Sequence, residues 1–327
     1  MDIEFKRGYM IYTDSKNKEI MFVTPHSGPA LASPVTRDDH SETVATRCWE
    51  LIGGILVIST MPRDRLFGID FNRYIPTLKS AIEHYELFKN NNSNEKRHKY
   101  LKKYAWVAKD EADYYSRLQI YQNFWEDVCK GKIIIFVHKN FPKIKAVPSI
   151  MDIITFSQKG IKKKTIKEIV EVINAKYFDF FQKIATDYRN AVVSETKRFV
   201  LDTLRIYEHF NPNEMSPGRR EGIEKDLKKI TSYADPIAIN RLKINFTPYN
   251  FLAAVENAVG RSPLPCVTIE DVHDGSLALG PVNKLFPQND KIIIEVECNG
   301  FLNFWHPHMA AKIIKDVVDK IKENGVD

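Results

Sequence analysis

The sequence lacks the long hydrophobic runs that a membrane-spanning helix needs. No apolar stretch approaches the ~20 residues that cross a bilayer. The first residues, Met1 to Lys6, do not show the basic and then apolar pattern of a secretion signal. Cysteine is also scarce, and the four cysteines are scattered without the paired spacing of a zinc cluster. We therefore expect a reduced, cytoplasmic protein that does not contact a membrane.

A large excess of charge of one sign is missing as well. The 48 basic residues are offset by 42 acidic ones, which leaves a formal net charge of +6. Such a mild excess is typical of a solvated surface, so nucleic acid is not an expected partner. The 43% of hydrophobic residues and the length of 327 residues suit one large domain, or a domain that carries a sizeable insertion. The oligomeric state stays open, a homo-oligomer included.

The first part of the chain shows a strand, helix, strand pattern. Residues 19–24 are a short apolar run that ends at Pro25-His26-Ser27-Gly28, which is typical of a buried strand delivering a loop. Residues 41–51 have helical spacing, with Ser41 as a candidate cap and Gly53-Gly54 as the stop. Residues 55–58 form a second apolar run. This order predicts parallel strands in an α/β sheet.

The middle of the chain, residues 76–245, is rich in Lys, Tyr and Phe and mostly helical in period. Its one clear strand candidate is 132–138. The aromatic residues between 114 and 125 could form a stacking surface, but their spacing is more typical of the buried side of helices. We expect this segment to be a large, mostly helical insertion.

The α/β character returns after residue 245. A short helix is expected at 251–259, strands at 265–269 and 291–296, and a final amphipathic helix at 309–321. The predicted fold is therefore α/β, with a mixed and mostly parallel central sheet flanked by helices. Residues 1–75 and 246–327 would together form this core.

Several polar residues lie in or just after the apolar runs. His26 and His273 each follow a predicted strand, and Glu295 lies inside one, where an unpaired carboxylate is costly to bury. In open α/β sheets, ligands gather at the carboxyl ends of the strands. Two histidines and one carboxylate with an open fourth position are the ligand set of a catalytic zinc. Asp38, Asp39 or Glu42 could supply the carboxylate, although each of these residues taken singly is more typical of a structural position.

Three further features bear on the same site. Alternation along a strand places Glu297 on the same face as Glu295, so either could act as a base. His138 ends its own predicted strand and is more typical of a structural histidine. The segment 63–73 holds several arginines, which are suited to binding a substrate carboxylate through two parallel hydrogen bonds.

The order of these segments resembles the N-formylglutamate amidohydrolase family, which belongs to the wider zinc carboxypeptidase-like (zinc exopeptidase-like) fold. The resemblance rests on a Pro-His-Ser-Gly loop at 25–28, a following Asp at Asp39, an Asp-x-Asn-Arg segment at 70–73, an aromatic-x-Pro-Tyr segment at 246–249, an Asp-x-His strand end at 271–273 and a late carboxylate at Glu295. About half of the chain, namely its two ends, takes part.

The resemblance implies a role for each matched residue. His26, Asp39 and His273 would bind one divalent metal, for which Zn²⁺ suits the mixed nitrogen and oxygen ligands, although manganese, cobalt or iron would also fit. Glu295 would be the general base toward water. The other implied residues are Arg73, Asn72 and Arg65 as catalytic groups that hold the substrate or its developing oxyanion, and Arg63, Ser27 and Glu297 as substrate-binding groups.

The implied activity is metal-dependent hydrolysis of a carbon–nitrogen amide bond in a small N-acyl amino acid or peptide-like molecule. The segment from His273 to Glu295 is shorter than in the family and lacks its Asn-x-Pro-Tyr-x-Gly-Gly motif, which predicts a different substrate pocket. The alternative is a non-catalytic binding protein on a degenerate scaffold, whose basic, aromatic insertion contacts nucleic acid or a protein partner. The presence of all four key residues, His26, Asp39, His273 and Glu295, favours the enzyme.

Overall fold

The structure, a computed structural model, describes residues 1–31, 37–90, 95–140, 147–206, 231–245, 247–273, 275–287 and 290–324. The described strands form one eight-stranded sheet in the order β1-β2-β4-β3-β5-β8-β6-β7. Their bounds are β1 (Asp2–Lys6), β2 (Tyr9–Thr13), β3 (Ile20–Thr24), β4 (Ile55–Ser59), β5 (Ile133–Asn140), β6 (Ser149–Ile154), β7 (Cys266–Ile269) and β8 (Ile292–Asn299).

The sheet is mixed and mostly parallel, as predicted. β3, β4, β5 and β8 run in one direction as its centre, with β2 antiparallel to β4 and β1 antiparallel to β2. On the other side, β6 is antiparallel to β8, and β7 is parallel to β6. β7 therefore runs against the central strands, and this reversal decides where its carboxyl end lies.

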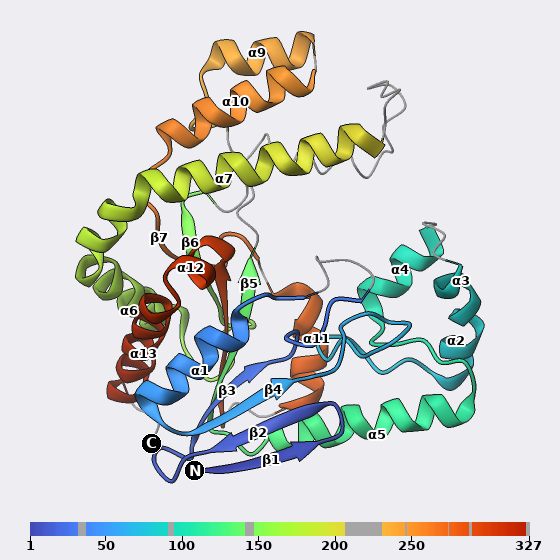
Figure 1. The fold of residues 1–327 in the computed structure, drawn as a ribbon. Helices are drawn as coiled ribbons and strands as arrows, with labels where there is room; N and C mark the ends of the chain where they lie inside the picture. The colour runs from blue at the N-terminus through green and yellow to red at the C-terminus, as the bar shows by residue number, and fades with distance from the viewer. Residues whose placement is uncertain are drawn as a thin grey trace.

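Helices cover both faces of the sheet (Figure 1). Their bounds are α1 (Ser41–Ile52), α2 (Leu78–Glu83), α3 (Tyr85–Lys89), α4 (Glu95–Lys103), α5 (Glu111–Val128), α6 (Lys163–Lys176), α7 (Phe178–Ile206), α9 (Pro236–Ile244), α10 (Pro248–Arg261), α11 (Ser276–Leu285), α12 (Gly300–Trp305) and α13 (Pro307–Glu323). Among the described residues, no helix is long and apolar enough to cross a membrane.

The central strands are apolar on both faces because both faces are buried. Along β3, Ile20 and Phe22 pack into the core beneath α1 and α13, whereas Met21 and Val23 face the opposite core beneath α5. Strands with one solvated face would alternate apolar and polar residues instead. The continuous apolar runs at 19–24, 55–58 and 291–296 were for this reason readable from the sequence, and the structure confirms all three strands.

The start of α1 differs from the expectation. The cap residue is His40, not Ser41, and its backbone is left-handed with φ 66°. Ser41 is the first helical residue, and its hydroxyl lies 3.3 Å from the Ser27 hydroxyl, so it fastens the loop after β3 to the helix. The helix ends at Gly53, as predicted, where φ is 84°.

The segment 76–245 is not a separate helical insertion. β5 lies between β3 and β8 at the centre of the sheet, and β6 extends the sheet beyond β8. The strand at 132–138 was recognised from the sequence, but its place in the same sheet was not. β6 was missed altogether, because the buried Asp152 interrupts its apolar run.

The aromatic residues of α5 form the buried side of that helix, as expected. Tyr114, Tyr121, Phe124 and Trp125 pack into the core under the sheet, and Tyr115 is exposed. This burial removes most of the stacking surface that binding to bases would need.

We expect Phe22→Ala to lower the free energy of unfolding by about 3–5 kcal/mol, because it leaves a cavity in a strand that is buried on both faces. Phe178→Ala, at a residue that is 51% exposed, is the matched control and should change stability by no more than about 0.5 kcal/mol. Urea unfolding followed by circular dichroism measures both. Equal effects of the two substitutions would contradict the buried position of β3.

Candidate metal centre

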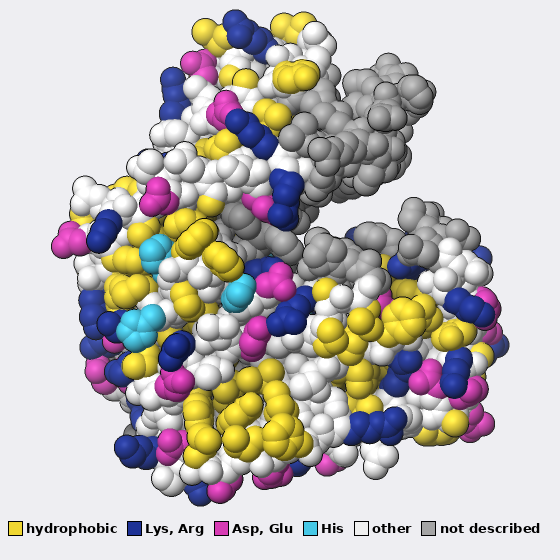
Figure 2. Space-filling model, viewed as in Figure 1, with side chains coloured by type: hydrophobic (Ala, Val, Ile, Leu, Met, Phe, Trp, Pro, Cys, Tyr) yellow, Lys and Arg dark blue, Asp and Glu magenta, His cyan; other side chains and the backbone are white. Residues whose placement is uncertain are grey.

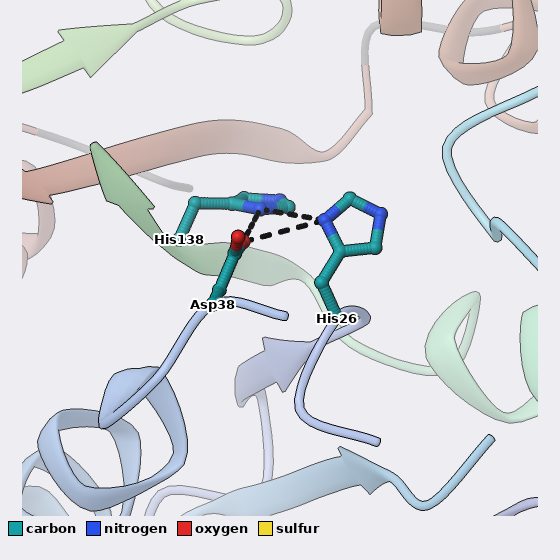
Figure 3. Close-up of side chains that lie close together, drawn as sticks. All are labelled: His26, Asp38 and His138. Carbon is teal, nitrogen blue, oxygen red and sulfur yellow. Dashed lines mark hydrogen bonds and ion pairs between the residues drawn. The ribbon is translucent and has the colours of Figure 1, made fainter. Parts of the chain in front are cut away.

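Three buried side chains meet at the carboxyl edge of the central strands (Figure 3). His26 follows β3, His138 lies on β5, and Asp38 precedes α1. The two histidine Nδ1 atoms are 3.2 Å apart. The Asp38 Oδ2 atom lies 2.8 Å from Nδ1 of His138 and 3.3 Å from Nδ1 of His26.

The sheet brings the two histidines together. β3 and β5 are parallel neighbours, with Val23 paired to Phe136, so both chains leave the sheet at the same edge. His26 lies three residues past that pair and His138 two. The backbone N–H of Asp38 donates to the His26 carbonyl at 3.0 Å, which returns the loop to the strand end.

Gly28 allows the loop after β3 to lie against the segment that follows β4. A Cβ atom at this position would lie 1.9 Å from the Met61 carbonyl oxygen, closer than any real contact. Only glycine therefore permits this approach, which brings His26 within reach of the residues around Asp70.

Asp70 orients His26 through the far side of the ring. His26 Nε2 lies 3.0 Å from Asp70 Oδ1. Burial alone would raise the pKa of Asp70, but the guanidinium groups of Arg65 and Arg63 hold it well below its usual range. An ionised carboxylate can only accept, so Nε2 carries the hydrogen and Nδ1 turns a lone pair toward Asp38 and His138. Burial and the nearby Arg63 lower the pKa of His26, which keeps the ring neutral.

His138 lies between two carboxylates and the side-chain amide of Asn72. Its Nε2 lies 3.2 Å from the Asn72 side-chain amide and 3.7 Å from Glu295 Oε2. Burial alone would lower the pKa of His138, but the Glu295 carboxylate and the hydrogen bond to Asp38 outweigh it and raise the pKa to about 9. The Asn72 atom at this distance is Nδ2, which can only donate, so a protonated Nε2 requires the amide to be turned until its oxygen faces the ring. The Nδ1–H donates to Asp38, so a proton lies between these two residues when no metal does.

The donor set fits a divalent metal. A tetrahedral zinc with bonds of about 2.0–2.1 Å separates its ligand atoms by roughly 3.3 Å. The three separations here are 3.2, 3.3 and 2.8 Å, so a small outward movement of Asp38 would make room for the ion. Two imidazole nitrogens and one carboxylate oxygen, each with a partner behind it, are the ligands that zinc prefers.

Asp39, the expected carboxylate ligand, lies outside this cluster. Its side chain is 47% exposed and bonds Lys139 at 2.8 Å and Arg37 at 3.3 Å. Glu42, the alternative, pairs with Arg37 at 2.7 Å. The preceding residue, Asp38, takes the position instead, because its backbone bond to His26 turns its side chain inward.

His273, the expected second histidine, also lies elsewhere. Because β7 runs against β3 and β5, its carboxyl end does not share their edge of the sheet. The backbone N–H of His273 donates to the buried Asp152 carboxylate, as do those of Asp271 and Val272. The His273 side chain is exposed, and among the described residues His138 is the second histidine of the cluster.

Three of the predicted site residues bond other parts of the protein, namely Arg65, Ser27 and Asn72. Arg65 is buried, bonds Asp70 and donates to the Arg63, Leu101 and Tyr104 carbonyls, so its role is to hold the loop and not the substrate. Ser27 bonds Ser41, and Asn72 contacts His138, so both support the cluster from within.

Arg63 and Arg73 bond the protein less completely than Arg65 does. The Arg63 side chain is 25% exposed, bonds Asp70 through Nε and lies 4.0 Å from Asp38 Oδ1 through a terminal nitrogen. Arg73 is buried, and its Nε has no hydrogen-bond partner in the part of the chain that the structure describes. A buried cationic donor without a partner costs free energy unless a ligand satisfies it.

Glu295 and Glu297 lie together on β8, on the same face of the sheet as His138. Burial and the neighbouring Glu295 carboxyl raise the pKa of Glu297, against the opposing effect of His138. One Glu297 carboxyl oxygen, Oε2, lacks a partner among the described side chains. Glu295 Oε2 lies 3.7 Å from Nε2 of His138, and Glu297 is the residue paired with His138 across the two strands.

No family model matches the chain, and no curated protein matches it. Among solved structures, it is similar to the gene product Atu2144 from Agrobacterium tumefaciens, with 10% sequence identity and a TM-score of 0.45 over 98% of this chain and 96% of that chain. A likeness at this level identifies no family.

Proposed function

We propose that this chain is a metal-dependent hydrolase that cleaves a carbon–nitrogen amide bond in a small N-acyl amino acid or peptide-like substrate. The observation that carries the proposal is the convergence of three buried ligand atoms, from His26, Asp38 and His138, beside the Glu295 carboxylate. The resemblance of the loop at 25–28 and the segment at 70–73 to N-formylglutamate amidohydrolases supports the choice of an amide.

His26, Asp38 and His138 would hold the metal, with zinc favoured by the two nitrogens and one oxygen. When bound, such an ion supplies Lewis acidity, which polarises a carbonyl and lowers the pKa of water. Asp70 and Asn72 keep the two imidazole rings in the orientation that aims both Nδ1 atoms at one point.

Glu295 would accept a proton from water and return it to the leaving nitrogen. Its carboxylate is buried on β8, and a buried base needs a position within reach of the reacting atoms more than it needs solvent. Arg63 and Arg73 would bind the negative charge of the substrate, because they retain donors that the protein itself does not fully use.

The ligand set can be tested by metal content. We expect His26→Ala and His138→Ala each to abolish the retention of zinc after dialysis, because each removes one of three ligands. Asp39→Asn and His273→Ala are the matched controls and should retain it. Elemental analysis by mass spectrometry measures all four, and a His138→Ala protein that keeps stoichiometric zinc would rule this ligand set out.

Asp70→Asn should weaken zinc affinity by about 10- to 100-fold, because the carboxylate behind a ligating histidine fixes the tautomer of its ring. Competition with a chromophoric chelator measures the affinity, and circular dichroism checks that the variant folds. Asp39→Asn, which also removes an acidic charge near the site, should leave the affinity unchanged. Equal losses in the two variants would show that only net charge matters.

Glu295→Gln should lower kcat by about 10²- to 10⁴-fold while zinc is retained, because it removes the proton acceptor. The assay is amine release from a panel of N-formyl and N-acetyl amino acids by the zinc-loaded protein. Glu297→Gln is the control. A comparable loss of kcat in this variant, and not in Glu295→Gln, would identify Glu297 as the base. Absence of turnover by the zinc-loaded wild-type protein across such amides would contradict the proposed hydrolase.

A further inference from the structure

Two buried asparagines, at the end of β8 and on α12, have side-chain atoms without hydrogen-bond partners. Asn299 and Asn303 are each 1% exposed. Asn299 Oδ1 accepts from the Phe301 N–H at 3.0 Å. Within the described part of the chain, Asn299 Nδ2 has no partner, and neither do Nδ2 and Oδ1 of Asn303. Buried polar atoms left unpaired cost free energy, which a bound polar group would recover.

The register of the sheet places Asn299 beside the metal centre. β8 pairs with β5 so that Glu297 lies opposite His138 and Asn299 lies opposite Asn140. Alternation along the strand turns Asn299 to the same face as Glu297. Asn299 follows Glu297 by two residues, which is about 7 Å at the usual rise of a strand. The short acyl chain of a small substrate bridges such a distance.

The helix after β8 places Asn303 next to Asn299. Asn299 caps α12, and Asn303 follows it by four residues, a spacing that brings two side chains to the same side of a helix. The next residue, Phe304, contacts the His40 ring with 5.0 Å between the ring centres, and His40 lies two residues after Asp38. α12 therefore borders the metal centre both through β8 and through the loop before α1.

The outer side of α12 is open to solvent. Phe304 is 54% exposed and Trp305 is 66% exposed. Figure 2 shows hydrophobic side chains gathered over α12 and a histidine beside them, over the start of α1. Because Asn303 directly precedes these two aromatic residues, its unpaired amide lies close to surface that a ligand can reach.

We propose that Asn299 and Asn303 bind an uncharged amide on the acyl side of the substrate, an inference that rests on the hydrolase function proposed above. A carboxamide has a carbonyl that accepts hydrogen bonds and an N–H that donates them. It therefore matches the Nδ2 donors of both asparagines and the Oδ1 acceptor of Asn303. A carboxylate only accepts, so it would leave Oδ1 unpaired, and an alkyl group would leave all three atoms unpaired.

The order of the strands gives the bound substrate a direction. In the order β4-β3-β5-β8, the two histidines of the metal centre belong to the inner strands, since His26 follows β3 and His138 lies on β5. Arg63 follows β4 on one side, and Asn299 ends β8 on the other. The substrate carboxylate would lie toward Arg63 and the acyl amide toward Asn299, with the scissile bond between them. The proposed substrate is therefore an amino acid whose acyl group carries a carboxamide.

Three acyl derivatives of alanine with similar size test this subsite. N-succinamoyl-alanine carries the carboxamide, N-succinyl-alanine has a carboxylate in its place, and N-(4-methylpentanoyl)-alanine has an isopropyl group there. We expect kcat/KM of the zinc-loaded protein to be about 100-fold or more higher for the carboxamide, because a site built for hydrogen bonds rejects analogues that leave its polar groups unpaired. Asn303→Leu should remove the preference over the isopropyl derivative. Asn324→Leu, at an exposed residue after α13, is the matched control and should keep it.

Two measurements do not depend on turnover. Calorimetric titration of the zinc-loaded Glu295→Gln protein should show the same preference for the carboxamide in the dissociation constants. Asn303→Leu should not lower the melting temperature, because it removes two unpaired polar atoms from a buried position. Asn303→Ala is the second variant should leucine prevent folding, and it too should lose the preference.

The outcomes separate the subsite from the hydrolase function. Hydrolysis of N-acetyl-alanine without a preference for the carboxamide, in turnover and in binding, would overturn the subsite and leave the hydrolase function standing. Preferential binding of the carboxamide without hydrolysis of any derivative would contradict the hydrolase and support the subsite. A lower melting temperature of Asn303→Leu with an unchanged preference would show that the asparagines hold buried water, and would also overturn the subsite.

Discussion

The parallel pairing of β3 with β5 is the constraint on which the rest of the structure depends. It makes both strands leave the sheet at one edge, and so it places His26 beside His138. It also closes the sheet between β3 and β8, which brings Glu295 next to His138. Because both faces of these strands are covered by helices, the cluster lies in a buried environment, where each polar atom needs a partner.

Charge balance follows from that burial. Asp38 and Asp70 place two carboxylates in the interior, and the positive charges of Arg63, Arg65 and His138 offset them. Removing such groups from water costs several kcal/mol per ion, and apolar residues of similar size often give a protein equal or greater stability. A network of this kind is therefore poor evidence for stability. Its position at the end of the central strands is better accounted for by ligand binding.

The sequence predicted individual strands and helices well. It predicted less well which strands and side chains lie next to one another. The strands at 19–24, 55–58 and 291–296 were predictable because uninterrupted apolar runs need burial on both faces. His138 and His273 both follow apolar runs, and only strand direction separates them, since β7 runs against β5. Asp38 and Asp39 are adjacent identical residues, and one backbone hydrogen bond to His26 decides which of them faces inward. Neither strand direction nor that bond leaves a signal in composition or periodicity.

Gly28 offers no side-chain ligand atom and carries no charge, yet the position of His26 depends on it. Any side chain there would meet the Met61 carbonyl and push the loop after β3 away from the segment that carries Asp70. In a random mutagenesis screen for loss of metal binding, substitutions of Gly28 would therefore be recovered together with substitutions of the ligand residues. Such a screen would detect positions that allow two backbone segments to approach, as well as positions that coordinate the metal. Measuring the folding of each variant would tell these two classes of position apart.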